Sequence, residues 1–276
     1  MPVAGHRDFY ARLITGRAGV SDNVLIEAFA TVAREAFVGP GPWQVFAFAN
    51  GYVHTPTNEL AYLYQDVLVA LASDRRINNG EPSLHARCLA ALAPRQGEEV
   101  LHVGSGTGYY TAILARLVGP KGSVTAYEIE RDLAEQARAN LATLENVSVR
   151  NRSGTNDDLP PCDAIYVNAG ATHPLSTWLD ALRVGGRLLF PLTPDEGMGS
   201  MLLVSRTSSS TYAARHVWPA MFIPCFGARN AVAAARLSAA LARRDVHTIA
   251  SLVRNDAPNE TCWCAGDGWW ISTAPP

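Results

Sequence analysis

The sequence has little charge and no excess of either sign. Only 17% of its 276 residues are charged, the formal net charge is −2 and the pI is near 6.4. Nucleic acid or an anionic membrane surface favours a clear basic excess, so we expect neither as a partner. Long apolar runs are also missing, since none reaches the roughly 18 residues of a membrane-spanning helix. The polar start of the chain has no apolar signal core. We therefore expect a cytoplasmic protein.

Cysteine is also scarce. The chain has five, an odd number, and it is too long to be a disulfide scaffold, so we expect free thiols. The closest pair is Cys262 and Cys264, and no second pair of ligands lies near it in the sequence. We therefore expect no metal site. With 48% hydrophobic residues the chain can bury a sizeable core.

Three parts follow from the residue pattern. Residues 1–95 read as an N-terminal helical and loop region, 96–225 as alternating strands and helices, and 226–276 as an extension of a helix and a hairpin packed on the core. In the first part, Asp22 predicts a helix start and Pro40 a helix end. Proline at a first-turn position predicts a second helix from Pro82 to about residue 93. Residues 41–82 are predicted to be irregular.

The middle part alternates between apolar strand runs and helical segments. This pattern is typical of a largely parallel α/β sheet with helices on both faces. The predicted strands are 100–103, 123–128, 147–150, 163–168, 186–192 and 200–205, and the predicted helices are 109–119, 131–144 and 173–182.

A glycine-rich turn joins the first of these strands to its helix. Gly104, Gly106 and Gly108 let the backbone approach a bulky ligand. Glu128 ends the second strand, 24 residues after Gly104, where a carboxylate can accept both hydroxyls of an adenosine ribose. An NAD site prefers its third glycine one position later, where Tyr109 stands. The spacing therefore favours S-adenosylmethionine, and a turn without a ligand would leave Glu128 unexplained.

Five segments are similar to one enzyme family. They are VLIEAFATVAREAFVGP (24–40), EPSLHA (81–86), VLHVGSGTGYYTAILA (100–115), DAIYVNAGA (163–171) and GGRLLFP (185–191). On these segments, residues 20–225 resemble the protein-L-isoaspartate O-methyltransferases, which are class I S-adenosylmethionine-dependent enzymes. The resemblance implies a Rossmann-like, seven-stranded methyltransferase sheet. It also implies that the cofactor lies at the carboxyl ends of the strands and leaves as S-adenosylhomocysteine.

The chain departs from the family pattern at three places. His102 stands where the family usually has Glu. Asn78-Asn79-Gly80 replaces Thr-Ile-Ser, so that Gly80 takes the position of a serine implicated in catalysis. Arg152-Ser153-Gly154 replaces Gly-Asp-Gly, whose aspartate holds the adenine, and Ser153 is left to take this role. Isoaspartyl methylation is therefore one of several possible activities.

The acceptor segment, residues 41–80, differs most from the family loop. It contains YLYQD (62–66), which is similar to the family's Ala-Tyr-x-Asp, and it continues through Asp74-Arg75-Arg76. We consider two interpretations, a reshaped acceptor pocket and a longer surface loop. For the substrate we predict contacts with Asn78, Asn79 and Gly80.

The cofactor site is predicted from the turn and the strand ends. Asn168 ends a strand at the edge where ligands bind in open α/β sheets, and Tyr109 is expected either on the cofactor or in the core. The predicted cofactor-binding residues are Gly104, Ser105, Gly106, Thr107, Gly108, Tyr109, Glu128, Ile129, Ser153, Gly154 and Asn168.

The chemistry depends on the methyl acceptor. A carboxylate is ionised at pH 7 and needs no base, so catalysis is mostly positioning. An amine, phenol or thiol must lose a proton, and the candidate bases are His85, Glu81, Asp66 and His54. We therefore favour an enzyme that methylates a carboxylate of a peptide, protein or small metabolite. The alternatives are small-molecule N-, O- or S-methylation and cofactor binding without transferase activity. Either a monomer or a homodimer is compatible with the sequence.

Overall fold

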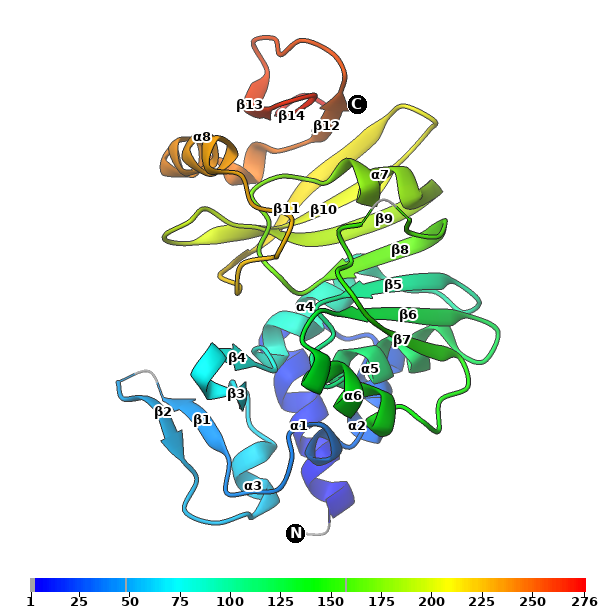
Figure 1. Cartoon of the computed structure of the whole chain (residues 1–276), viewed down its shortest axis with the longest axis vertical. Helices are drawn as coiled ribbons and strands as arrows, with labels where there is room; N and C mark the ends of the chain where they lie inside the picture. Colours follow the sequence, from blue (N-terminus) through cyan, green and yellow to red (C-terminus); the bar gives the residue numbers. More distant parts are fainter. Residues whose placement is uncertain (1–2, 48, 157) are drawn as a thin grey trace. The chain divides into compact units, whose positions relative to one another are not determined.

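The computed structural model describes residues 3–47, 49–156 and 158–276, in two compact units (Figure 1). The first unit contains residues up to 98 and residues 105–152, and the second contains residues 99–104 and the chain from 153 onward. The sequence predicted three domains, 1–95, 96–225 and 226–276. This division into domains stays a prediction.

The first unit is mainly helical and carries one parallel strand pair. α1 and α2 contact each other and α4, and α6 contacts both strands of the pair. Its elements are α1 (Val3–Ala18), α2 (Asn23–Thr31), η1 (Arg34–Phe37), β1 (Gln44–Ala47), β2 (Gly51–His54), α3 (Leu60–Leu63), β3 (Ala70–Ala72), η2 (Ser73–Arg75), β4 (Ile77–Asn78), α4 (Pro82–Leu92), α5 (Tyr109–Val118), β6 (Ser123–Glu128), α6 (Arg131–Asn140) and β7 (Val147–Asn151).

α2 begins as predicted but ends early. The Asp22 carboxylate accepts hydrogen bonds from the backbone N–H groups of Val24 and Leu25, at 2.9 and 3.4 Å. The helix stops at Thr31 instead of near Pro40, and Val32 is extended. The predicted end was wrong because the chain turns to bring Arg34 into hydrogen bonds with the acceptor segment. Tertiary contacts override local propensity there.

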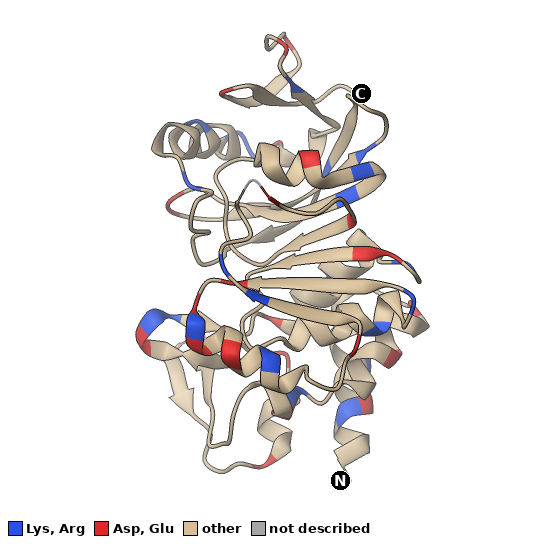
Figure 2. Cartoon of the chain, turned by 45° about the vertical axis from the view of Figure 1, so that its right-hand side comes forward, with Lys and Arg blue, Asp and Glu red and all other residues tan. Residues whose placement is uncertain are grey.

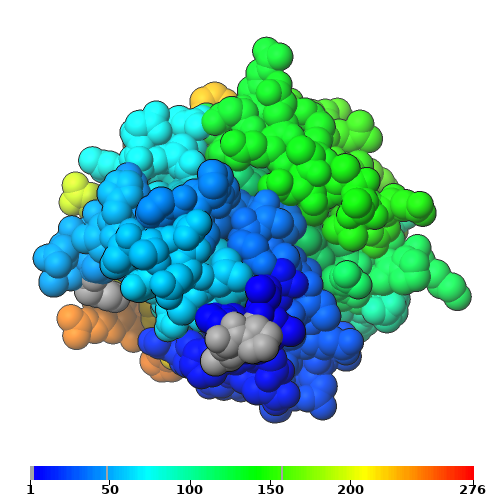
Figure 3. Space-filling view, turned by 90° about the horizontal axis from the view of Figure 1, so that it is seen from below, coloured from blue at the N-terminus to red at the C-terminus, as the bar shows by residue number. Residues whose placement is uncertain are grey.

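The acceptor segment forms two small hairpins, so the prediction of an irregular stretch was wrong. β1 pairs antiparallel with β2, from Gln44 opposite His54 to Ala47 opposite Gly51. β3 pairs with β4, and the backbone N–H of Asn79 donates to the Val69 carbonyl. In Figure 3 the N-terminal helices and this segment, blue to cyan, form a continuous surface.

The second unit contributes eight neighbouring strands of a sheet, in the order β13-β14-β12-β11-β10-β9-β8-β5. β5, β8 and β9 are parallel and the remaining pairs are antiparallel. The elements are β5 (Glu99–Val103), β8 (Cys162–Val167), α7 (Ser176–Ala181), β9 (Leu182–Leu192), β10 (Gly199–Arg206), β11 (Tyr212–Ala220), α8 (Ala231–Ala242), η3 (Val246–Thr248), β12 (Ser251–Arg254), β13 (Cys262–Gly266) and β14 (Trp269–Ser272).

The expected fold class is confirmed. Strands β5 to β11 are the seven strands that the resemblance implies, and the C-terminal extension adds three antiparallel ones. The predicted hairpin is present as β13 and β14, and Trp263, Trp269 and Trp270 are buried, so they cover the core of this unit. Two predicted helices were too long, since α6 ends at Asn140 and not at 144, and α7 is shorter than 173–182. The helix expected in the C-terminal extension is α8.

The charged residues are dispersed over the elements. Figure 2 shows lysine and arginine interspersed with aspartate and glutamate along the helices and strands. Within the described ranges of the chain, no helix is both long enough and apolar enough to cross a membrane.

Candidate functional site

The glycine turn and Glu128 are joined by a direct hydrogen bond in the first unit. Gly106 has φ of +55° and its backbone N–H donates to Glu128 Oε2 at 2.7 Å. Glu128 Oε1 accepts from the backbone N–H of Glu130 at 3.0 Å. Burial raises the pKa of the Glu128 carboxyl. Each oxygen of an ionised carboxylate keeps a further lone pair, so this group can still accept ribose hydroxyls.

Asn168 and the first glycine adjoin each other in the second unit. The backbone N–H of Asn168 donates to the Val103 carbonyl at 2.8 Å, and its side-chain Nδ2 lies 2.8 Å from His102 Nε2. Gly104 has φ of +74°, and a Cβ on it would lie 3.4 Å from the Asn168 backbone. The positive φ explains a glycine at this place.

Two buried polar atoms near the turn have no hydrogen-bond partner among the described residues. They are Ser105 Oγ in the first unit and Asn168 Oδ1 in the second. A buried polar atom without a partner costs free energy, and a bound ligand is one common way to satisfy it. Within the first unit, the Ser105 hydroxyl, the positive φ of Gly106 and the buried Glu128 fit a nucleoside cofactor such as S-adenosylmethionine.

Three predicted cofactor residues point into the protein core. Thr107 Oγ1 donates to the Phe37 carbonyl. A Cβ on Gly108 would lie 2.7 Å from Leu141 Cδ1. Tyr109 is buried against Phe37, and its hydroxyl lies 3.3 Å from that of Tyr10. Burial raises the pKa of the Tyr109 phenol well above its usual range. These contacts support the core interpretation of Tyr109 and give all three a role in seating α5.

The remaining predicted cofactor residues lie at strand ends. Ile129 follows Glu128 and its side chain is exposed. In the second unit, Ser153 Oγ lies 2.7 Å from Thr155 Oγ1, and the Gly154 carbonyl accepts from the Trp178 indole at 2.8 Å. Ser153 is therefore already engaged in a local hydrogen bond.

The predicted substrate residues form a turn that is held by the side chains of Asn78 and Asn79. Asn78 Oδ1 accepts from the backbone N–H of Gly80 at 2.9 Å. Asn79 is buried, and its Oδ1 accepts from the Val69 backbone N–H at 3.1 Å and from Arg34 Nη2 at 3.2 Å. Asn79 therefore holds the turn in place, and Asn78 shapes its end.

His85 lies beneath this turn and is 2% exposed. Its ring stacks on Tyr110, with the ring centroids 3.7 Å apart and the planes at 13°. A Cβ on Gly80 would lie only 2.0 Å from His85 Nε2. The imidazole thus fills the space that a side chain at residue 80 would need.

The two carboxylates near α4 differ in environment. Asp66 Oδ1 accepts from the Ser83 backbone N–H at 2.8 Å, in the first turn of α4, and Oδ2 lies 3.0 Å from Arg17 Nε. Glu81 precedes the helix and makes no capping bond. Burial and the nearby Asp66 carboxylate raise the pKa of Glu81. His54, at the end of β2, is exposed and lies 3.2 Å from Gln44 Nε2.

Ion pairs tie the acceptor segment to the segment that follows Glu128. Arg75 lies in η2 and pairs with Glu130, and it contacts both carboxylate oxygens of Asp132, with Nη1–Oδ1 at 3.0 Å. Leu71 lies over the glycine turn, because its Cδ1 would be 3.3 Å from a Cβ on Gly106. Both contacts favour the pocket interpretation of residues 41–80 over a detached surface loop.

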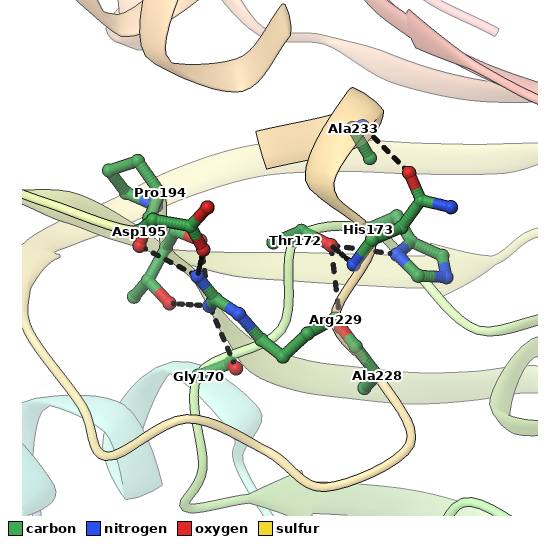
Figure 4. Close-up of polar contacts among 10 residues, drawn as sticks. Gly170, Thr172, His173, Pro194, Asp195, Ala228, Arg229 and Ala233 are labelled. Carbon is green, nitrogen blue, oxygen red and sulfur yellow. Dashed lines mark hydrogen bonds and ion pairs between the residues drawn. The ribbon is translucent and has the colours of Figure 1, made fainter. Parts of the chain in front are cut away.

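Two arginines that the sequence did not single out organise these regions. Arg34 is fully buried, and it donates to the carbonyls of Leu63, Gln65 and Val67. In the second unit, Arg229 donates to the carbonyls of Gly170, Thr193 and Pro194 and pairs with Asp195 (Figure 4). No local sequence pattern marks either residue, because their partners are backbone carbonyls far away in the sequence.

The fold and the glycine turn define a Rossmann-like methyltransferase that uses S-adenosylmethionine. The family model described as "Protein-L-isoaspartate(D-aspartate) O-methyltransferase" matches residues 6–230. The chain belongs to this family, as the resemblance predicted.

Individual relatives and solved structures agree. A protein-L-isoaspartate O-methyltransferase of Methylorubrum populi is 33% identical over 210 residues, 75% of this chain and 88% of the relative. One from Brucella anthropi is 29% identical over 211 residues, 76% and 88% of the two chains. A solved protein-L-isoaspartate O-methyltransferase superposes with a TM-score of 0.67 at 26% identity, over 87% of this chain and 69% of its own. A putative Plasmodium falciparum enzyme, solved with S-adenosyl-L-homocysteine, has the same fold, with a TM-score of 0.64 at 18% identity over 79% and 97% of the chains.

Proposed function

We propose that the protein methylates the free carboxylate of an isoaspartyl residue in a peptide or protein. Family membership supports a carboxylate acceptor. The observation that carries the proposal is that two of the three candidate bases nearest the acceptor turn are committed to structural contacts. An acceptor that must be deprotonated would need a free base there, whereas a carboxylate would not.

The two candidate bases engaged in structural contacts are Asp66 and His85. Asp66 holds the first turn of α4 and pairs with Arg17, and its side chain is 1% exposed. His85 is buried, stacked on Tyr110 and covered by Gly80. Neither side chain is presented as a base to an incoming acceptor.

Carboxylate methylation suits a site built for positioning. The carboxyl group of a peptide has a pKa near 4 and is an ionised nucleophile at pH 7. Bound S-adenosylmethionine supplies an electrophilic methyl group on its sulfonium sulfur. The protein has to align the acceptor oxygen and exclude water. The acceptor segment, held by Arg34 and Arg75, provides a fixed wall for this purpose.

At residue 80 the serine hydroxyl of the family is missing, and His85 fills the place of its side chain. We propose that the backbone of the turn, together with Asn78, takes over contact with the acceptor. Asn78 is only partly buried.

The experiment compares three peptides that differ only at one residue: isoaspartyl, aspartyl and asparaginyl. Each is incubated with labelled S-adenosylmethionine, and methanol released by mild base is measured, since a carboxyl methyl ester is base-labile and an N-methyl product is not. We expect base-labile methyl groups on the isoaspartyl peptide alone. Stable methylation, or equal rates on the aspartyl peptide, would contradict the proposal.

One observation favours a second candidate function, methylation of a small molecule with Glu81 as base. Its raised pKa and its exposed position are properties of a general base. Glu81→Gln separates the two functions. Carboxylate methylation should survive this change, whereas a reaction that depends on Glu81 for deprotonation should be lost.

We also propose that the enzyme works in the cytoplasm, as a monomer or homodimer, without nucleic acid or a membrane as partner. The small net charge supports the absence of these polyanionic partners. Four of the five cysteines are buried free thiols, which suits a reducing compartment. Light scattering of the purified protein measures the assembly directly.

A further inference from the structure

In the side-chain amide of Asn168, the nitrogen has a hydrogen-bond partner and the oxygen has none among the described residues. Its Nδ2 lies 2.8 Å from His102 Nε2. Its Oδ1 is buried, with no hydrogen-bond partner in the described part of the chain. This acceptor atom therefore lacks a donor that a ligand could supply.

The His102 contact fixes which way the amide faces. An amide nitrogen only donates, so Nε2 of His102 must accept, and the ring proton must be on Nδ1. Burial keeps the ring neutral, since it lowers the pKa of His102 to about 3. A neutral ring with Nε2 as acceptor cannot bond Oδ1, so Oδ1 is turned to the other side.

His102 itself has little freedom to move. It is fully buried in β5, and its ring stacks on Tyr166 of β8, with centroids 5.5 Å apart and planes at 15°. The backbone N–H of Asn168 is bonded to the Val103 carbonyl, beside Gly104. The Asn168 backbone is thus held beside the first glycine of the turn, and its side-chain amide is held against His102.

We propose that Asn168 Oδ1 accepts a hydrogen bond from the α-ammonium group of S-adenosylmethionine, and that His102 is the positioning residue for this contact. The inference rests on the cofactor assigned above. Within the cofactor, donors are the ammonium group, the adenine amino group and the ribose hydroxyls. Of these donors, only the ammonium group carries a charge. A hydrogen bond from a charged donor is the stronger choice for a buried neutral acceptor.

This pairing also explains how the chain tolerates histidine where the family usually has a carboxylate. A charged imidazolium would repel the ammonium group, whereas this imidazole is neutral and only orients the amide. In this arrangement Asn168, at the end of β8, contacts the ammonium group, and His102 of β5 only positions the amide.

Calorimetry with two ligands tests the proposal. S-adenosylhomocysteine carries the ammonium group, and 5′-methylthioadenosine keeps the adenine and ribose without it. For Asn168→Ala we expect affinity for S-adenosylhomocysteine to fall about tenfold or more, as for loss of a hydrogen bond to a charged group. Affinity for methylthioadenosine should change by less than about twofold.

The His102 variants test the positioning role. His102→Phe keeps an aromatic ring but lacks the acceptor nitrogen. We therefore expect affinity for S-adenosylhomocysteine to fall selectively, but by less than in Asn168→Ala. His102→Gln offers an amide oxygen as acceptor and should retain more of the affinity. Asn230→Ala, which removes the cap of α8 in the same unit, is the matched control and should leave both affinities unchanged. Thermal melting checks that each variant is folded.

The outcomes are distinct. A selective loss of S-adenosylhomocysteine affinity in Asn168→Ala and His102→Phe supports the proposal. Equal loss for both ligands, or no loss for either, overturns it while leaving the cofactor assignment intact. If the wild-type protein binds neither ligand, the cofactor and the proposed function fail together.

Discussion

His85 Nε2 lies 2.0 Å from the place that a Cβ atom on residue 80 would occupy. Gly80 has φ of +74°, a conformation that L side chains rarely adopt. The acceptor turn and the buried imidazole are therefore matched to each other. This relationship explains why a serine, which the family has at this position, does not fit here without a change at residue 85.

Gly80→Ala should be strongly destabilising in the wild-type background. The overlap with the ring and the strained φ together should lower the free energy of unfolding by about 2–4 kcal/mol. In a His85→Ala background the overlap is gone, so Gly80→Ala should lower the free energy of unfolding only through the strained φ, by about 1 kcal/mol. A double-mutant cycle by urea unfolding measures this coupling. Additive effects would show that the ring and the turn are independent.

Arg34 is predicted to be the main support of the acceptor segment. Arg34→Met leaves the carbonyls of Leu63, Gln65 and Val67 without their donor, so we expect a loss of about 3 kcal/mol or more. Arg34→Lys should recover little, since an ammonium group cannot match the planar fork. Arg116→Lys, on an exposed part of α5, should stay within about 0.5 kcal/mol of wild type. Chemical denaturation checks all three, and a neutral Arg34→Met would contradict the assignment.

Two substitutions of Asp66 test whether its carboxylate has a structural or a catalytic role. Asp66→Asn keeps an oxygen for the Ser83 N–H, so we expect most of the methyltransferase activity to remain. Asp66→Ala removes the bond as well, and should cost about 1–2 kcal/mol of stability. Activity and melting temperature are measured on both variants. Loss of activity in a stable Asp66→Asn would instead identify Asp66 as a base.

The order of strands and helices could be predicted because it depends on local signals. Apolar runs such as 100–103 and the glycines at 104–108 dictate strand and turn wherever they occur. The end of α2 could not, because Arg34 leaves the helical path for distant carbonyls. The short hairpins of the acceptor segment contain too few alternating residues to give a strand pattern.

The sequence predicted the kind of site, but not the directions in which its side chains point. Glu128 and Gly106 are joined by a hydrogen bond, and the role of Glu128 at the ribose stays a prediction. Sequence spacing cannot show, however, that Tyr109 packs on Phe37 or that His85 lies under Gly80, because both facts depend on which side of a helix meets the core. Arg229 could not be singled out for a related reason, since its backbone partners lie on two distant segments, at Gly170 and at Thr193-Pro194.

His102 gives the stability a defined pH dependence. Its folded-state pKa of about 3 lies below the ordinary value of 6.5, so between these values the unfolded chain binds a proton that the folded chain does not. Stability from this residue is therefore complete above about pH 6.5 and falls by up to about 1.4 kcal/mol per pH unit as the pH drops toward 3. Urea unfolding of wild type and His102→Gln from pH 7 to pH 4 isolates the effect. The difference between them should shrink with acid, and a constant difference would rule out a buried neutral imidazole.

The central claim is that S-adenosylmethionine binds where Gly106 and Glu128 meet. Calorimetric titration of S-adenosylhomocysteine into wild type, Gly106→Val and Glu128→Ala tests it most directly, with the exposed Glu145→Ala as control. We predict that wild type and Glu145→Ala bind alike, and that both site variants lose about tenfold or more in affinity. If Gly106→Val and Glu128→Ala bind as tightly as wild type, the cofactor lies elsewhere and the account is wrong.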